Sequence, residues 1–260
     1  MYCSDATAGQ GTVVAVSRHG LMPRVHRGDG SPGRSHWLPV FSQASGAVRF
    51  TDLMWQVRAT ISDHPAGWQD VVHTLRPHVP ALWERLPLGD KRLFLRHVAR
   101  YWEVHRHRIP PRTASRLAAL RAAGRLSVHA GRVSGVSQQP GGLLARVESD
   151  GGAHDLPCGW LINATGPATN LAATSDPLLR DLLGRGLARP DPLGLGLAAG
   201  PSGALLSAKG RPSDVLFTLG PTLRGCRYET TAIPEIRDQA AALARLTSAT
   251  HAPGRPVSAA

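Results

Sequence analysis

The segment TVVAVSRHG, Thr12 to Gly20, decides how the chain is interpreted. Its β-branched run from Thr12 to Val16 predicts a short buried strand, and Ser17, Arg18 and His19 follow directly. In a dinucleotide-binding βαβ unit the second strand ends beside the adenosine ribose, where an arginine can accept the 2′-phosphate that distinguishes NADP from NAD. A guanidinium suits that dianion because it stays charged and binds in a bidentate manner. Alternatively, Arg18 is an ordinary arginine in a strand-end turn, and the spacing alone favours this second interpretation.

The glycine pattern argues against a complete phosphate-binding loop. A dinucleotide fingerprint needs GxGxxG directly after a strand and at the start of a helix. The GQGT segment at Gly9 precedes the predicted strand, and GLGLAAG from Gly194 runs into Pro201 with no helix behind it. Nucleophilic catalysis has equally little support, because no GxSxG segment is present. The sequence therefore indicates no catalytic residue.

The composition is strongly basic. The 260 residues carry a formal charge of +12, which ordinarily indicates a polyanionic partner such as nucleic acid or an acidic membrane surface. The 30 basic residues include only two lysines, Lys91 and Lys209, so the others are arginines. That imbalance indicates a compositional bias spread over the whole surface, and the charge is weak evidence of function.

The cysteines and the hydropathy bear on the compartment. Cys3, Cys158 and Cys226 are an odd number, lie far apart and form no CxxC, which is typical of a reduced cytoplasmic protein. An apolar run of about 18 residues and a leader of the charged-then-apolar type are both missing from the sequence. We expect a cytoplasmic protein without a membrane partner.

The most regular helical pattern is KRLFLRHVARYWEVHRHRI, residues 91–109, which Pro110 and Pro111 end. It predicts one continuous helix with a single apolar face. The members of that face are Phe94, Val98, Tyr101, Trp102, His105 and Ile109.

Two functions suggested by this helix are disfavoured by its geometry. His105 and His107 would lie roughly 200° apart around the helix, so they cannot bind one metal ion, and we expect His105 to be packed and His107 exposed. The aromatic side chains share the aliphatic stripe, which indicates packing inside the protein more than stacking on bases. We expect neither a metal nor a nucleic-acid partner. Arg106, His107 and Arg108 at its end could instead face an anionic cofactor or substrate.

The periodicity changes from helical to β after a helix at 114–123 that Gly124 closes. Successive strands are expected within 125–166, separated by Gly-rich turns. A helix ended by Gly184 or Gly186, a buried strand within 214–221 and a final helix that begins near Thr231 follow. We expect a disordered tail at 252–260.

Six segments in this order resemble the C-terminal half of the bacterial FAD/NAD(P)-binding protein family. They are SRHGLMPRVH (17–26), FLRHVARYWEVHRHRIPP (94–111), GRLSVHAGRV (124–133), WLINATGP (160–167), DPLLRDLLGRGLARPDPLGLGL (176–197) and LGPTLRGCRYETTAIPEIRDQA (219–240). That family groups with FAD-dependent urate hydroxylases and aspartate N-monooxygenases and is distantly similar to flavin-containing monooxygenases. The resemblance runs from about residue 10 to residue 246 and is specific for the family, not for a substrate.

The resemblance implies an FAD-binding Rossmann domain split in sequence by an NAD(P)H-binding domain. It implies that 12–16 is the second strand of the NAD(P)H domain. It further implies contacts to the nicotinamide or flavin nucleotide from the residues that match its motifs. These cofactor-binding residues are Ser17, Arg18, His19, Ala164, Thr165, Gly166, Pro167, Gly220, Pro221, Thr231, Ala232, Ile233 and Pro234. The start of the final helix would offer N–H groups to the pyrimidine edge of the flavin.

The family's two glycine-rich phosphate loops have no counterpart in this sequence. We therefore expect an α/β fold that is an incomplete pair of Rossmann-like dinucleotide-binding domains with an inserted helical segment. The expected parts are 1–125, the rest of the NAD(P)H domain with the helical segment, and 126–251, the C-terminal part of the FAD domain.

The expected function is that of a C-terminal portion of an FAD-dependent, NADP-using oxidoreductase, a monooxygenase acting on a small-molecule substrate. Two alternatives stay open. One is a non-enzymatic fragment or a subunit that depends on a missing N-terminal half, and the other is a basic nucleic-acid-binding protein.

Overall fold

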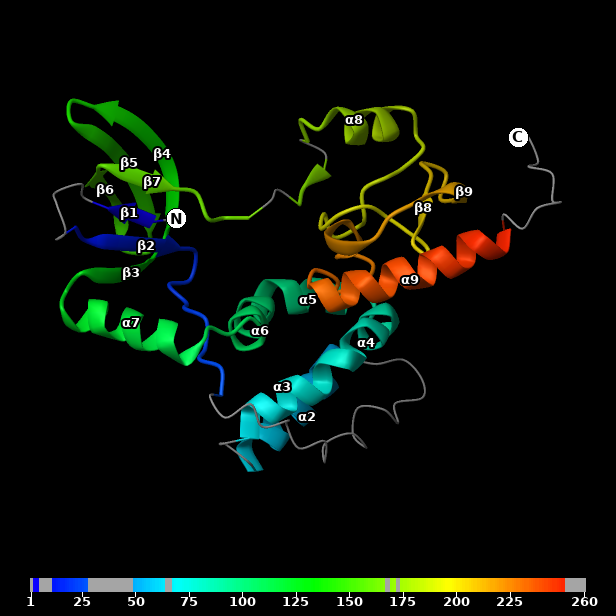
Figure 1. Ribbon diagram of the computed structural model, residues 1–260, viewed down its shortest axis with the longest axis horizontal. Coiled ribbons are helices and arrows are strands. Elements are labelled where there is room, and N and C mark those ends of the chain that lie inside the picture. The colour runs from blue at the N-terminus through cyan, green and yellow to red at the C-terminus, as the bar shows by residue number, and fades with distance from the viewer. Residues whose placement is uncertain are drawn as a thin grey trace. The chain divides into compact units, whose positions relative to one another are not determined.

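The computed structural model describes residues 2–4, 11–27, 49–63, 67–166, 169–171 and 174–250. The chain forms two compact units (Figure 1). Unit 1 contains Met1–Ser35, Ile61–His73 and Leu93–Pro167, and unit 2 contains His36–Thr60, Thr74–Arg92 and Ala168–Ala260. The expected boundary after residue 125 differs from this division, because the strands on its two sides pair within unit 1. The expected tail at 252–260 lies outside the described residues.

The helices and strands occur in groups along the chain. The helices are α2 (Phe50–Asp63), α3 (Trp68–Leu75), η2 (Arg76–His78), α4 (Val79–Arg85), α5 (Leu88–His97), α6 (Ala99–Arg106), α7 (Pro111–Ala122), α8 (Pro177–Gly184), η4 (Gly220–Leu223) and α9 (Ile233–Thr250). The strands are β1 (Tyr2–Ser4), β2 (Val13–Ser17), β3 (Leu126–Ala130), β4 (Arg132–Gln139), β5 (Gly142–Ser149), β6 (Gly152–Cys158), β7 (Trp160–Ile162), β8 (Ala204–Leu206) and β9 (Pro212–Phe217). The expected mixed α/β class is confirmed at this level. Among the described helices none has the length and apolar character needed to cross a bilayer.

Unit 1 is built on a four-stranded sheet in the order β3-β2-β1-β7. The strand predicted at 12–16 is β2, and it pairs in parallel with β3 from Val13↔Leu126 to Ser17↔Ala130. A parallel pair needs a long crossover connection, and the chain between these strands supplies it with helices that include α7. β1 is antiparallel to both β2 and β7. It follows that β3, β2 and β7 all run in the same direction.

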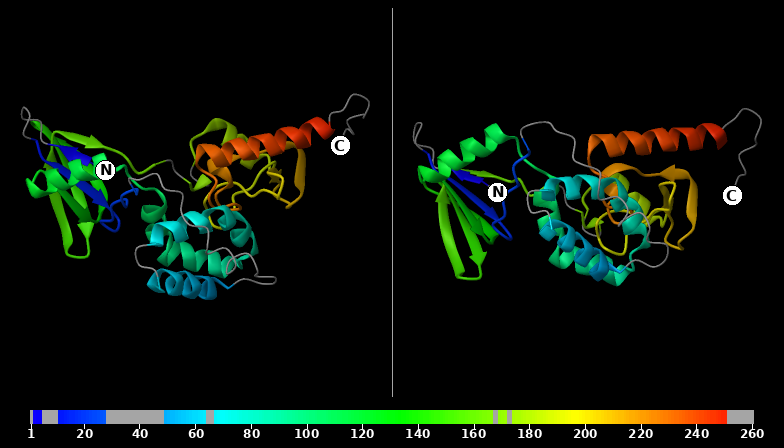
Figure 2. Two further views of the ribbon diagram at one scale, coloured as in Figure 1. Left: turned by 60° about the horizontal axis from the view of Figure 1, so that its bottom comes forward. Right: turned by 90° about the horizontal axis from the view of Figure 1, so that it is seen from below.

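The second sheet of unit 1 is an antiparallel meander of β4, β5 and β6. Its turns carry glycines with positive φ, Gly141 at 88° and Gly152 at 104°, where a side chain would be strained. Figure 2 shows the ribbon of this meander beside the first sheet. The inward side chains Ala145 and Cys158 pack with Val14 and Leu161 of the first sheet. Cys158 is disulfide-bonded, so the expectation of wholly reduced thiols is wrong for this residue. Cysteine number and spacing carried no information about which residues the fold brings together.

The expected single helix over 91–109 is wrong. The structure has two helices, α5 and α6, which meet at Val98 with φ −117° and ψ −33°. The change of direction at Val98 ends the continuous stripe, so Tyr101 is 47% exposed instead of packed. Phe94 and Trp102 are half-buried. The prediction from the sequence assumed ideal helix geometry at Val98, where the backbone departs from it.

The segment that follows β2 is tied to the end of α6. The Arg24 amide donates to the Val104 carbonyl (2.8 Å), and the Ile109 amide donates to the Arg24 carbonyl (2.9 Å). Val25 and Ile109 form an isolated parallel bridge. This pairing keeps the chain beyond the β2 end close to α6.

Unit 2 has its core around Leu171, Ala188, Leu197 and Leu205. The expected helix at 177–184 is confirmed as α8, which the Asp176 side chain caps by accepting from the Leu179 amide (2.9 Å). The strand expected within 214–221 is β9, shifted toward the N-terminus, and the final helix is α9. The indole of Trp83 packs on the ring of Tyr228 with centroids 4.7 Å apart, which joins α4 to the loop before α9.

Candidate functional site

The carboxyl ends of β3, β2 and β7 lie along one edge of the four-stranded sheet, because these strands run in the same direction. In Figure 1 the chain leaves β2 and β7 on the same side of the sheet. Tyr2 of β1 pairs with Ala15 on one side and with Ile162 on the other, so these two residues are level. The strands are separated by two inter-strand spacings, about 10 Å. The fold therefore brings the segments 17–19 and 164–166 to one edge of one sheet.

The turn after β2 is fixed by the carbonyl of Ser17. That oxygen accepts from the Gly20 amide (3.2 Å) and from the Gly131 amide (2.9 Å), which follows β3. A glycine is needed at position 20, where φ is 60° and an added Cβ would lie 3.2 Å from the Ala130 nitrogen. The side chains of Ser17, Arg18 and His19 are exposed as a result.

The exposed edge is positively charged. Arg100 of α6 lies close enough to His19 to act on it, together with Arg18. The pKa of His19 is lowered from its ordinary value of 6.5, first by a slight loss of solvation and then by the charges of Arg100 and Arg18. In the part of the chain that the structure describes, neither arginine forms an ion pair with a carboxylate. The edge is therefore a site of uncompensated positive charge.

Arg100 is the residue that sequence reasoning missed at this edge. Its guanidinium lies over the Tyr101 ring, 4.9 Å from the centroid, and donates to the Arg96 carbonyl (3.2 Å). Nothing in the local sequence separates it from the other arginines of the helical segment. Only the pairing of the chain after β2 with the end of α6 places it near His19.

The loop after β7 is shaped by Asn163, which was also missed. Its side-chain oxygen accepts from the Thr165 amide (3.1 Å) and from the Thr165 hydroxyl (2.7 Å). This local turn leaves Ala164, Thr165 and Gly166 exposed, with Gly166 at φ 78°. An asparagine two residues before a threonine is a recognisable turn signal. Pro167, the fourth expected residue here, lies outside the described residues.

The remaining expected residues belong to unit 2 and lie around the loop from η4 to α9. The Gly220 amide donates to the Gln239 side-chain oxygen (2.8 Å), and the Gly220 carbonyl accepts from the Thr230 hydroxyl (3.1 Å). The Gln239 side-chain amide donates in turn to that hydroxyl (2.6 Å). Gly220 is buried and Pro221 exposed. The amide of Gly220 is thus already used inside the protein.

The start of α9 offers less to an electron-rich ligand than expected. The helix begins at Ile233, and Pro234 has no N–H to donate. Glu235 in the first turn is ion-paired with Arg76, so a carboxylate already lies at the positive end of the helix dipole. Thr231 and Ile233 are exposed and Ala232 is half-buried. The expected residues of unit 1 and unit 2 thus differ in charge. The edge in unit 1 is cationic, whereas the start of α9 already contains the carboxylate of Glu235.

The two histidines at the end of α6 contact different partners. The His105 ring contacts the edge of Trp68 at 4.9 Å between centroids, and the His107 ring lies 3.1 Å from the Glu103 carboxylate. Among the described residues no three His, Cys, Asp or Glu side chains gather in a way that could hold a metal ion.

The comparisons add no family to this geometry. No family model, no curated protein and no solved structure matches the chain.

Proposed function

We propose that the chain is part of an FAD-dependent, NADP-using oxidoreductase, and that the edge of unit 1 binds the adenosine end of NADPH. The observation that carries this proposal is the gathering of Arg18, His19 and Arg100 at the carboxyl ends of parallel-running strands. In open α/β sheets, ligands bind outside the carboxyl ends of the strands.

The strand order of the sheet supports the same proposal. Counted along the chain, its members stand in the order third, second, first, fourth, which matches the first four positions of the dinucleotide-binding sheet. One feature departs from that pattern, because the first strand, β1, is antiparallel to its neighbours. β2, β3 and β7 have the relative directions that the half-domain requires.

The charge of the edge favours a phosphorylated ribose over a free one. NAD-binding sites place a carboxylate on the ribose 2′-hydroxyl, whereas NADP-binding sites place an arginine on the 2′-phosphate. Arg18 and Arg100 supply guanidinium groups for the 2′-phosphate. The Thr165 hydroxyl of the neighbouring loop already donates to Asn163 (2.7 Å), so it is not assigned to the phosphate. These residues bind and orient the nucleotide, and none of them is assigned a proton transfer.

When bound, the cofactors supply the difficult chemistry, since NADPH provides a hydride and FAD accepts it. The proposed overall activity is a monooxygenation of a small-molecule substrate in the cytoplasm. The unit 2 loop at Gly220 would support the flavin side through the fixed position of its backbone. Its amide does not serve as a free donor, because Gln239 occupies it.

The first test is a fluorescence titration of the chain with NADPH and with NADH. We expect NADPH to bind the more tightly, and Arg18→Gln to weaken NADPH binding about tenfold without changing NADH binding, the effect of one charge-assisted hydrogen bond. Arg121→Gln is the matched control. Arg121 is exposed on the last turn of α7, just before β3 begins, and so lies near the amino edge of the sheet. Equal losses in the two variants would contradict the assignment of Arg18.

The second test is a visible spectrum after addition of FAD, followed by an assay of NADPH oxidation. Saturable flavin binding with NADPH oxidation supports the oxidoreductase. NADPH binding without either signal would favour the alternative of a non-enzymatic, partner-dependent subunit. Retention on polyanion that falls steeply with salt, without preference for NADPH, would favour the nucleic-acid alternative.

A further inference from the structure

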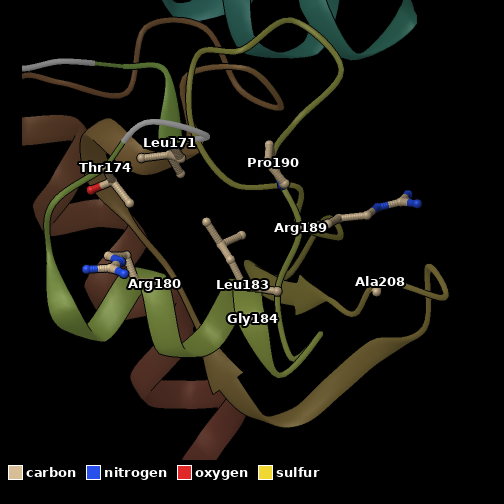
Figure 3. A pocket seen from close by; sticks show the side chains of 9 residues that line it. Leu171, Thr174, Arg180, Leu183, Gly184, Arg189, Pro190 and Ala208 are labelled. Atoms are coloured by element: carbon tan, nitrogen blue, oxygen red, sulfur yellow. The ribbon is translucent and has the colours of Figure 1, made fainter.

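Unit 2 contains a cavity of about 550 Å³ beside α8 (Figure 3). Its volume lies in the range of small-molecule sites. Most of its lining is apolar. The lining residues are Leu171, Thr174, Arg180, Leu183, Gly184, Ala188, Arg189, Pro190 and Ala208.

The polar groups of the cavity are unevenly distributed. Figure 3 shows Arg180 and Thr174 on the same side, with Leu171 and Leu183 next to them. The guanidinium of Arg189 extends away from these side chains, and it lies beside Gly210. One guanidinium and one hydroxyl therefore border the apolar part of the cavity.

Arg180 is available to a ligand. It is exposed on α8, and among the described residues it has no ion pair with a carboxylate. Asp181, the next residue, is paired with Arg185 at 3.2 Å on another part of the helix surface. The Thr174 hydroxyl accepts from the Asp176 amide (3.2 Å), which leaves its hydrogen free to be donated.

We propose that this cavity binds a small apolar monoanion, an aromatic or branched aliphatic carboxylate. The carboxylate accepts from Arg180 and from the Thr174 hydroxyl, and the apolar body packs on Leu171 and Leu183. Burial of that body and one charge-assisted contact act together, because neither alone gives appreciable affinity in an open site. A multiply charged phosphate fits poorly, because a single guanidinium faces the apolar part. The proposal is independent of the nucleotide edge in unit 1.

Calorimetric titration of the full chain with 2-naphthoate and with 2-naphthamide tests the proposal. The two probes have the same apolar body and differ in charge. We expect saturable binding of the acid and at least about tenfold weaker binding of the amide. In Arg180→Gln the affinity for the acid should fall about tenfold, to a value near that of the amide.

Arg185→Gln is the matched control, because it removes the same charge from the residue that ends α8, outside the cavity lining. We expect it to change the affinity for 2-naphthoate by less than about twofold, the size of a surface electrostatic effect. Circular dichroism of each variant checks that α8 is intact. The proposal is overturned if 2-naphthoate does not bind, if it binds no better than the amide, or if the two variants lose affinity equally. If the circular dichroism spectrum of Arg180→Gln indicates unfolding, Thr174→Val is tested instead. We expect Thr174→Val to lose at least about threefold in affinity for 2-naphthoate.

Discussion

The hydroxyl of Thr230 joins the Gly220 loop to helix α9, and its removal should destabilise unit 2 measurably. The residue is 0% exposed. Its hydroxyl donates to the Gly220 carbonyl (3.1 Å) and accepts from the Gln239 side chain (2.6 Å). Thr230→Val keeps the shape of the side chain but leaves these two groups without their partner. An unsatisfied buried carbonyl costs about 1–3 kcal/mol, and a half-buried amide that can reach water costs about 0.5–1.5 kcal/mol, so we expect a loss of about 2–4 kcal/mol.

The assay is urea unfolding followed by circular dichroism, combined with hydrogen exchange of the Gly220 amide. That amide donates to Gln239, so its protection should fall together with the unfolding midpoint. Thr231→Val is the control, since it makes the same substitution one residue later at an exposed position. We expect it to change the free energy of unfolding by less than about 0.5 kcal/mol. If Thr230→Val were as mild as Thr231→Val, with the protection of Gly220 unchanged, the hydrogen-bond network would not hold this loop.

Three further predictions concern other residues. Trp83→Phe should lower the stability of unit 2 by about 2–4 kcal/mol in urea unfolding, because it removes the bond from the indole to the Gly225 carbonyl (2.9 Å) and part of a buried ring. If the edge of unit 1 binds NADPH, affinity should rise as the pH falls from about 7.5 towards the lowered pKa of His19, because a phosphate dianion favours the charged ring. Protonation of the phosphate near about pH 6 opposes that rise. His19→Gln should flatten that rise in a fluorescence titration. Burial raises the pKa of the Cys226 thiol, so iodoacetamide should label it more slowly in the folded protein than in urea at the same pH, as measured by mass spectrometry.

The sequence was sufficient for elements whose signals are local. The β-branched run at 12–16 predicted β2, because β-branched residues pack well on the pleated, partly buried surface of a sheet. The helix at 177–184 was predictable from Asp176 and Pro177, which satisfy and preorganise its first turn, and from the glycine that follows its end. The turns of the meander were predictable from their glycines for the same reason. These signals act over a few residues and do not depend on the rest of the fold.

Features that depend on distant segments were not predictable in this way. The break at Val98 between α5 and α6 lies in a stretch whose residues all tolerate a helix, so no local signal marked it. Arg100 reaches His19 only because the chain after β2 pairs with the end of α6. The bond from the Gly220 amide to Gln239 likewise joins two segments that sequence spacing does not relate.

The two groups of expected residues can be compared by what their polar groups already bind. In unit 2, the Gly220 amide and carbonyl are both used by Gln239 and Thr230, and the first turn of α9 contains a glutamate that is paired with Arg76. A ligand there would have to displace bonds that the fold already makes. In unit 1, Arg18 is exposed and Arg100 is half-buried with one bond to the Arg96 carbonyl, and neither has a carboxylate partner among the described residues. A ligand gains most from polar groups that have no other protein partner before it binds. We therefore expect nucleotide recognition at the edge of unit 1. The Gly220 loop serves to hold the structure.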